Sequence, residues 1–180
     1  MHTGRYVVMG VCGCGKTRIG SALAEALGLE FVEGDAFHPT SNLARMKAGV
    51  ALTDDERHPW LAALAERLRQ ARDAGQGLVM SCSALKQHYR DHLRAGAPDL
   101  QLVFLTGDRA TLAARLAARG NHFMPATMLD GQLAILERPV PDEHAWVCDI
   151  GAEPEAIVAA LVARADGSPG APSQTLGPQR

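Results

Sequence analysis

The chain has 180 residues, of which 47% are hydrophobic and 21% are charged, and its formal net charge is −2. This length and composition suit one domain with a buried core and exclude a wholly disordered chain. The small net charge gives no support for a nucleic acid or an anionic membrane as the main partner. No apolar run approaches the roughly 18 residues that span a bilayer. The first strand begins too early to leave room for a signal peptide, so we expect a cytoplasmic protein.

The chain begins with an expected strand, a glycine-rich loop and a helix. Residues 6–9 are apolar, and the apolar residues of 19–27 recur at helical spacing. Between them, residues 10–17 read GVCGCGKT, which fits the phosphate-binding pattern G-x-x-x-x-G-K-[ST] at every fixed position. Backbone N–H groups of such a loop converge on phosphate oxygens, and the helix N-terminus adds to the attraction. The pattern predicts nucleotide binding, with Lys16 on the β- and γ-phosphates and the Thr17 hydroxyl on Mg²⁺.

A second strand is expected at residues 29–32, and the polar loop EGDAFHP follows it at 33–39. Strands that alternate with helices are typical of an α/β fold, in which ligands bind at the carboxyl ends of the strands. Asp35 is therefore expected at the same edge as the phosphate loop, and we interpret it as an active-site residue. A helix is expected to start at Pro39.

Arg57 lies near the start of a further expected helix, which Thr53 or Asp54 could cap and whose apolar stripe runs through residues 60–74. A cation near a helix N-terminus is mildly unfavourable, so either Arg57 has an anionic partner or it is a solvated surface charge. After a third strand at 78–80, a helix from Leu85 carries Lys86 and Arg90 on one face. These two cations either address an anion or are solvated.

The second half of the chain continues the alternation. We expect a doubly buried strand at 100–106, a helix at 107–119, a returning helix at 128–137, a fifth strand at 145–149 and a last helix at 153–165. Residues 120–125 are bounded by Gly and Pro and preceded by arginines, which indicates a mobile lid over the phosphates. The composition after Asp166 predicts a disordered tail. The organisation is thus a single domain at 1–166, with a lid at about 119–128 and a tail at 167–180.

The four cysteines do not form a disulfide framework. Cys12 and Cys14 lie within the phosphate loop, where a bridge would distort the turn, and Cys82 and Cys148 end strand-like runs. None has zinc-site spacing, so we expect four free thiols in a reducing compartment.

Taken together, these segments resemble the gluconokinases, small ATP-dependent kinases of the shikimate-kinase and adenylate-kinase-like group of P-loop folds. The resemblance rests on EGDAFHP (33–39), CSALK (82–86) and HFMP (122–125) beside the phosphate loop, and it extends to about residue 140. It implies a three-layer α/β sandwich with a five-stranded parallel sheet in the order 2-3-1-4-5 and helices on both faces. It also implies a homodimer that transfers the γ-phosphoryl group of ATP to the 6-hydroxyl of D-gluconate.

The resemblance implies a role for each site residue. The ATP-binding set is Gly10, Val11, Cys12, Gly13, Cys14, Gly15, Lys16, Thr17, Arg115 and Arg119. The substrate-binding set is Asp35, His38, Lys47, Arg57, Lys86 and His122. Asp35, Lys16 and Arg119 are the catalytic residues, with Asp35 accepting or orienting the substrate hydroxyl, and Thr17 and Asp35 lie at the Mg²⁺. Arg57 holds the gluconate carboxylate, which a guanidinium matches bidentately.

Two departures from the family pattern carry expectations of their own. Gluconokinases usually have serine where this chain has Cys12 and Cys14, and Cys14 lies beside Lys16 and a helix N-terminus, a setting that favours thiolate. We therefore expect reversible inactivation by oxidation. Gly131 stands inside a helix where the family usually has serine, which costs a little helix stability.

Two alternative functions remain at this point. A shikimate-like or nucleoside monophosphate kinase would share the scaffold, but a monophosphate acceptor requires a larger basic cluster than Arg45, Lys47 and Arg57 beside their acidic neighbours. A non-catalytic ATP-binding regulator would share the loop, but it needs neither Asp35 nor the paired lid arginines.

Overall fold

The computed structural model describes residues 2–118 and 126–167. Five parallel strands form one sheet in the order β2-β3-β1-β4-β5, which confirms the fold class and strand order that the resemblance implies. The strands are β1 (Arg5–Met9), β2 (Glu30–Glu33), β3 (Leu78–Ser81), β4 (Gln101–Thr106) and β5 (Trp146–Asp149). Each lies within a residue or so of its predicted range.

The described helices connect and cover these strands. They are α1 (Lys16–Leu27), α2 (Thr40–Lys47), α3 (Asp54–Asp73), α4 (Gln87–Gly96), α5 (Arg109–Ala118), α6 (Ala126–Ile135) and α7 (Pro154–Ala165). Two short 3-10 helices, η1 (Gly34–Phe37) and η2 (Pro141–Glu143), follow β2 and precede β5. Residues 126–128 of the expected lid belong to the first turn of α6, while 119–125 of the lid and 168–180 of the tail lie outside the described residues.

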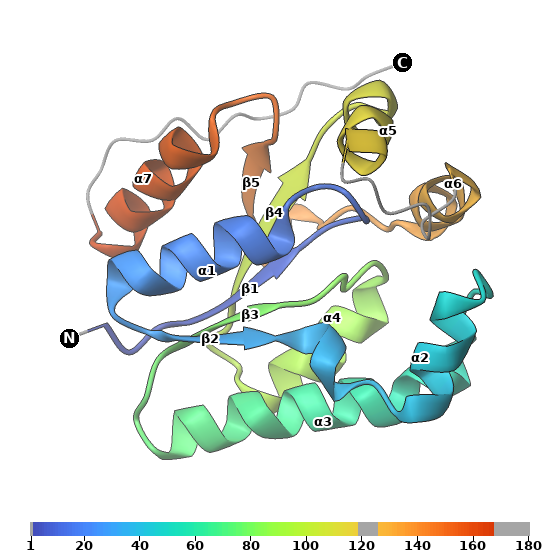
Figure 1. Cartoon of the computed structure of the whole chain (residues 1–180). Helices are drawn as coiled ribbons and strands as arrows, with labels where there is room; N and C mark the ends of the chain where they lie inside the picture. Colours follow the sequence, from blue (N-terminus) through green and yellow to red (C-terminus); the bar gives the residue numbers. More distant parts are fainter. Residues whose placement is uncertain (1, 119–125, 168–180) are drawn as a thin grey trace.

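The sheet is buried on both faces, as the three-layer prediction requires. Successive side chains of β1 alternate between two cores. Tyr6 and Val8 pack in the core that includes residues of α1 and α7, whereas Val7 and Met9 pack in the core that includes residues of α3 and α4. Figure 1 shows α1 and α7 on one side of the sheet and α3 and α4 on the other.

Helix α3 begins at Asp54 because the residues before it form a capping box. The Thr53 hydroxyl accepts from the Glu56 N–H, and the Glu56 carboxylate accepts from the Thr53 N–H. The apolar stripe predicted from the sequence begins further along, where Trp60, Leu64 and Leu68 are all at most 1% exposed. The cap therefore places Arg57 in the first turn of α3, ahead of the part that fills the core.

Helix α4 begins at Gln87 rather than at Leu85, and this separates the two cations expected on one face. Lys86 is the N-cap residue, whereas Arg90 is wholly buried. The Arg90 guanidinium donates to both carboxylate oxygens of Glu143, at 2.6 and 2.8 Å, and to the carbonyls of Ala84 and Glu137. Of the two alternatives predicted for Arg90, solvation is therefore wrong: the anion that Arg90 addresses is the Glu143 side chain, and the buried pair joins α4 to η2.

Arg90 also stabilises a strained turn at Ala84, which follows β3. Ala84 has a φ of +44°, a left-handed conformation that residues other than glycine rarely adopt. Its carbonyl accepts from Arg90 at 3.1 Å. Ser83 and Lys86 lie in the same turn as Ala84. The hydrogen bond from Arg90 to Ala84 therefore helps to fix the path of the backbone that carries them.

Cys12, Cys14 and Cys82 are buried and Cys148 is partly buried. Burial raises the pKa of the Cys82 thiol to about 12. None of the helices in residues 2–118 and 126–167 combines the length and apolar character that a membrane span requires.

Glu143→Gln is expected to lower the free energy of unfolding by about 3 kcal/mol at pH 7, because buried Arg90 loses its counter-ion. Burial alone raises the pKa of Glu143, but hydrogen bonds from Arg90 and Arg94 lower it from an ordinary 4.5 to about 2. A carboxylate with a lowered pKa stabilises the fold above its ordinary pKa, and this contribution disappears as the pH falls through the lowered value.

Urea unfolding of the parent chain and of Glu143→Gln at a series of pH values tests this. The difference between their free energies of unfolding should be constant above about pH 5 and shrink towards about pH 2. Glu66→Gln, which removes an exposed carboxylate paired with Arg69, is the control and should change stability little. A difference that stays the same down to about pH 2 would contradict the assignment.

Candidate active site

The phosphate loop closes because three of its glycines adopt positive φ. Gly10, Gly13 and Gly15 have φ of +145°, +81° and +94°. A Cβ at Gly10 would lie 2.6 Å from the Leu105 carbonyl oxygen, and one at Gly13 would lie 2.8 Å from Leu116 Cγ. The loop is thus packed against β4 and α5 at positions that only glycine can occupy. Its last glycine precedes α1, and no described side chain caps that helix N-terminus.

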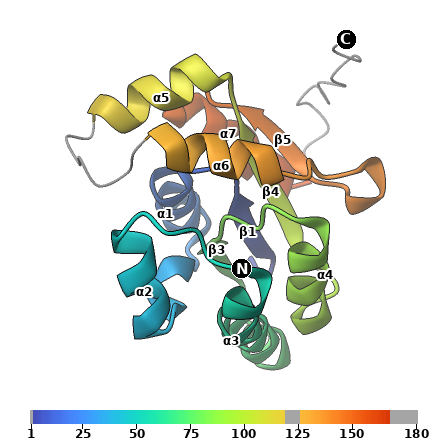
Figure 2. The same cartoon turned by 90° about the vertical axis from the view of Figure 1, so that its right-hand side faces the viewer.

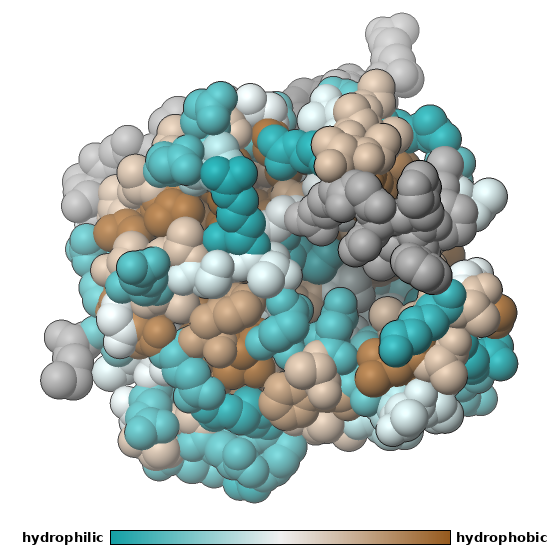
Figure 3. Space-filling model, viewed as in Figure 1, coloured by the Kyte–Doolittle hydropathy of each residue, from teal (hydrophilic) through white to brown (hydrophobic). Residues whose placement is uncertain are grey.

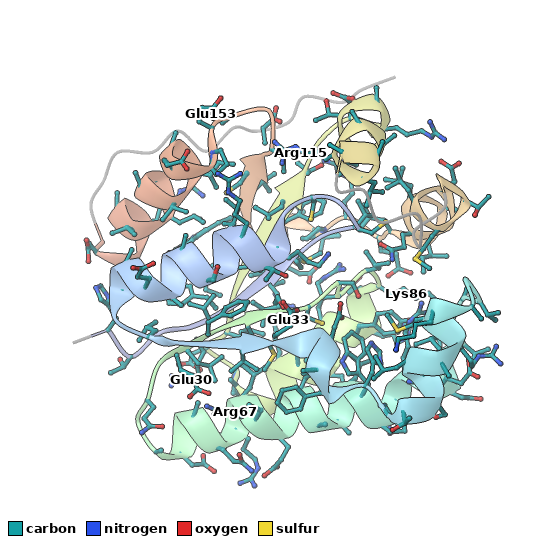
Figure 4. The ribbon with its side chains drawn as sticks, in the orientation of Figure 1. Glu30, Glu33, Arg67, Lys86, Arg115 and Glu153 are labelled. Atoms are coloured by element: carbon teal, nitrogen blue, oxygen red, sulfur yellow. The ribbon has the colours of Figure 1, made fainter. Side chains whose placement is uncertain are left out.

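Lys16 and Thr17 extend from the first turn of α1. The Lys16 ammonium donates to the Val11 carbonyl at 3.1 Å, so it lies over the loop. The Thr17 hydroxyl donates to Glu33 Oε2 at 2.6 Å. Glu33 ends β2, and its other oxygen accepts from the Ser81 hydroxyl; Figure 4 shows it at the strand end facing α1. Hydroxyl and carboxylate oxygens therefore meet beside the loop.

The turn after β2 is built around Gly34. A Cβ there would lie 2.0 Å from the Ser81 carbonyl oxygen, and the Gly34 carbonyl accepts from Trp60 Nε1 at 2.8 Å. This close approach directs η1 to the strand edge and leaves Asp35 exposed at a cavity. His38, also in the cavity wall, stacks on Trp60 with 4.2 Å between ring centroids. Burial lowers the pKa of His38, against the opposing effect of the Asp35 charge.

Cations gather around Asp54, in the same cavity wall as Asp35 and His38. Lys86 Nζ lies 2.9 Å from both oxygens of Asp54, and the Tyr89 hydroxyl donates to the same carboxylate. These hydrogen bonds, from Tyr89 first and then Lys86, lower the pKa of Asp54. Arg57 donates to the Tyr89 oxygen at 3.0 Å and lies 3.8 Å from Asp54. With a side chain only 15% exposed, Arg57 is not a freely solvated surface charge.

These residues and the phosphate loop line one cavity of about 600 Å³ at the carboxyl ends of the strands. Its other sides are the loop between α2 and α3, the turn after β3 and the inner face of α6. Figure 2 views the molecule from this edge, with α2, α4 and α6 arranged around the strand ends. A second hollow, of about 570 Å³, lies between α1 and α7 and has mostly apolar walls; Figure 3 shows apolar residues there. It contains none of the predicted site residues.

The comparisons with known proteins agree with this arrangement. The chain matches the AAA domain family over residues 6–139. It is 48% identical to a gluconokinase of Gluconobacter oxydans over 137 residues, which are 76% of this chain and 77% of that protein. The chain belongs to the gluconokinase family.

Two solved structures are also similar to this chain along most of its length. A sugar kinase from Janibacter is 44% identical, with a TM-score of 0.86 over 91% of this chain and 95% of that one. A gluconokinase from Sinorhizobium meliloti is 45% identical, with a TM-score of 0.83 over 92% and 95%. The family resemblance seen in the sequence is therefore confirmed.

The cavity brings together most of the residues that the gluconokinase resemblance assigns. Those in its wall are Cys12, Gly13, Gly15, Lys16, Thr17, Asp35, His38, Arg57 and Lys86. Gly10, Val11 and Cys14 are buried residues of the loop itself, and Lys47 is exposed at the end of α2 outside the cavity wall. Arg119 and His122 lie outside the described residues.

Arg115 lies beside the loop rather than in the cavity wall. One of its terminal nitrogens donates to the Ile150 carbonyl at 2.5 Å, and the other lies 3.9 Å from the Cβ position of Gly15. This places a cation next to the gluconokinase phosphate loop and ties α5 to the end of β5.

The structure gives no support to the expected oxidation of Cys14. Its side chain is 1% exposed and lies under Gly10, where a Cβ would be 2.8 Å from the sulfur. Because reactive cysteines need solvent access as well as thiolate character, burial shields this thiol while the loop stays closed.

Two residues of this gluconokinase-family site were missed by the sequence reasoning. Glu33 was treated only as part of the EGDAFHP segment, although an acidic residue that ends the strand beside the phosphate loop is a usable signal. Gln132, on α6, accepts from the Cys12 N–H at 2.7 Å. Nothing local marks Gln132, because its partner is 120 residues away.

Proposed function

We propose that this chain is an ATP-dependent kinase that phosphorylates D-gluconate to 6-phospho-D-gluconate in gluconate catabolism. The single observation that carries the proposal is one cavity whose wall contains the phosphate-loop motif, the cations Arg57 and Lys86, and the carboxylate of Asp35. The names of the similar proteins point to the same substrate. The cysteine spacing, which does not suit a disulfide framework, supports a cytoplasmic location, and the resemblance supports a homodimer.

The residues present fit a magnesium ion that arrives with the nucleotide. Thr17 and Glu33 share a hydrogen bond of 2.6 Å, and Asp35 follows two residues later in the same cavity wall. Oxygen ligands of this kind suit Mg²⁺, which keeps several waters and bridges phosphates. Thr17, Glu33 and Asp35 would hold the ion, which supplies charge neutralisation at the phosphates.

The reaction requires an in-line arrangement of the acceptor hydroxyl and the γ-phosphate. The bond from the 6-hydroxyl oxygen to phosphorus forms as the bond to the oxygen between the β- and γ-phosphates breaks, and ADP leaves. The hydroxyl proton passes to Asp35. Lys16 and the loop amides stabilise the charge on the phosphates, because such transition states depend on positioning and charge rather than covalent chemistry.

Gluconate is held from the far wall of the cavity. Arg57 presents a guanidinium whose planar fork matches a carboxylate. Lys86 and His38 line the same cavity and would bind sugar hydroxyls. With the carboxylate at Arg57, the extended chain of the sugar acid leads its other end towards Asp35 and the loop.

An ADP-release assay with MgATP and a panel of acceptors tests the proposal. Gluconate alone among gluconate, other sugar acids, shikimate and nucleoside monophosphates should strongly stimulate ADP release. Stimulation by a different acceptor would show that the chain is a kinase but that gluconate is not its substrate. Nucleotide binding without stimulation by any acceptor would favour the regulator.

Asp35→Asn is expected to lower kcat by roughly a hundredfold or more, on the scale of general-base effects. The amide keeps the shape of the side chain but cannot accept the hydroxyl proton, so the affinity for ADP measured without Mg²⁺ should stay near that of the parent chain. Asp55→Asn, an exposed acid outside the cavity wall, is the matched control. Near-normal turnover of Asp35→Asn would remove Asp35 from catalysis.

Arg57→Ala is expected to raise the KM for gluconate by about tenfold or more, with a much smaller change in the KM for ATP. Steady-state kinetics with each substrate varied in turn measures both. Arg45→Ala is the control, since Arg45 pairs with Glu56 and is not in the cavity wall. Equal increases in both constants would show that Arg57 supports the fold or the phosphate site instead.

A further inference from the structure

Helix α6 faces the cavity with one side and the core with the other. Met128, Gly131, Gln132 and Ile135 are in the cavity wall, at the spacing of one helical face. Leu129, by contrast, is fully buried in the core with α1 and α7. The cavity side therefore carries a carboxamide, that of Gln132, in a half-buried position.

The Gln132 carboxamide is joined directly to the phosphate loop. Its Oε1 accepts from the Cys12 N–H at 2.7 Å, a good distance for an N–H···O bond. A carboxamide has an acceptor oxygen and two N–H donors on the same carbon. The oxygen is committed to the loop, so the donors lie beside the loop as well, at the rim of the cavity. Within residues 2–118 and 126–167, no acceptor is found for them.

The position of these donors relative to the nucleotide follows from the loop. Residues 13–17 and the N-terminus of α1 surround the inner phosphates, and Lys16 extends to the terminal one. The terminal phosphate must lie between the loop and the acceptor wall with Asp35 and Arg57. Because α6 walls the same space, donors beside Cys12 face the group that is transferred.

We propose that Gln132 binds the terminal phosphate of ATP through its Nε2 donors while its Oε1 holds the loop at Cys12. This rests on the proposed function and adds a residue to it. A neutral donor aimed at the transferring group stabilises the charge that spreads over its oxygens. Since ADP lacks this phosphate, Gln132 makes the site distinguish triphosphate from diphosphate.

A purely structural role for Gln132, as an anchor of α6 on the loop, predicts something different. An anchor would support all loop-bound nucleotides equally. The two roles separate through the ratio of affinities for a non-hydrolysable ATP analogue and for ADP, because only the proposed contact depends on the third phosphate.

Two substitutions of Gln132 separate the acceptor function of the carboxamide from its donor function. Gln132→Glu keeps an acceptor for the Cys12 N–H, removes the donors and adds a negative charge. Gln132→Met removes acceptor and donors at similar size without adding charge. Ala134→Ser changes an exposed position of the same helix outside the cavity wall and is the matched control.

Calorimetric titration with AMP-PNP and with ADP, each in the presence of Mg²⁺, gives the ratio of the two nucleotide affinities. Both Gln132 variants should lose AMP-PNP affinity by about tenfold or more relative to ADP, the scale of a hydrogen bond to a charged group. Ala134→Ser should keep the parent ratio. In saturating substrates, kcat of both variants should fall by about a hundredfold, with the KM for gluconate changed little.

A parent-like ratio in Gln132→Met, with both affinities reduced together or neither reduced, would overturn the proposal and leave an anchor. The ratio compares two nucleotides on the same variant, so a loss of stability does not obscure it. The binding measurements contain no gluconate. If gluconate fails to stimulate the parent chain but the ratio collapses in both variants, the proposed substrate is wrong and the role of Gln132 stands.

Discussion

The left-handed backbone of the phosphate loop is the constraint on which the rest of the site depends. Where a side chain would stand at Gly10 or Gly13, the structure has the Leu105 carbonyl and Leu116 instead, so β4 and α5 are pressed against the loop. The Gly10 N–H donates to the Ser83 carbonyl at 3.3 Å, which ties the turn after β3 to the same loop. That turn carries Lys86. The conformation that exposes amides to phosphate thus also sets the distance to the acceptor wall.

The turn after β2 is fixed to the same framework from the other side. The Gly34 N–H donates to the Ser81 hydroxyl at 3.2 Å, and this hydroxyl in turn donates to Glu33. Glu33 accepts from Thr17 as well. A single serine at the end of β3 therefore connects the proposed metal-side carboxylate, the strand that bears it and the turn that presents Asp35. Such a network is rigid only when each member is satisfied, which is the case here.

The sequence predicts the parts of this arrangement that local spacing encodes. The loop motif, the apolar strands and the cap of α3 are local signals, and the family resemblance supplied the strand order. The sequence does not distinguish Lys86 from Arg90, which share one helical spacing but differ in burial. What separates them is Glu143, 53 residues from Arg90. Gln132 escapes prediction for the same reason, because its contact with Cys12 exists only after the sheet has assembled.

The charges around Asp54 bear on which acceptor fits. Lys86 is neutralised by Asp54, whose lowered pKa keeps it ionised, and Asp35 adds a second carboxylate to the cavity wall. Arg57, 3.8 Å from Asp54, has more donors left for a ligand than Lys86, which uses two of its three on Asp54. One carboxylate on the acceptor satisfies it. A phosphate dianion would bring a further negative charge close to two carboxylates in a partly enclosed site, where repulsion amounts to a few kcal/mol. If Arg57 binds the acceptor carboxylate, as proposed, the acidic residues beside it would select against phosphorylated acceptors.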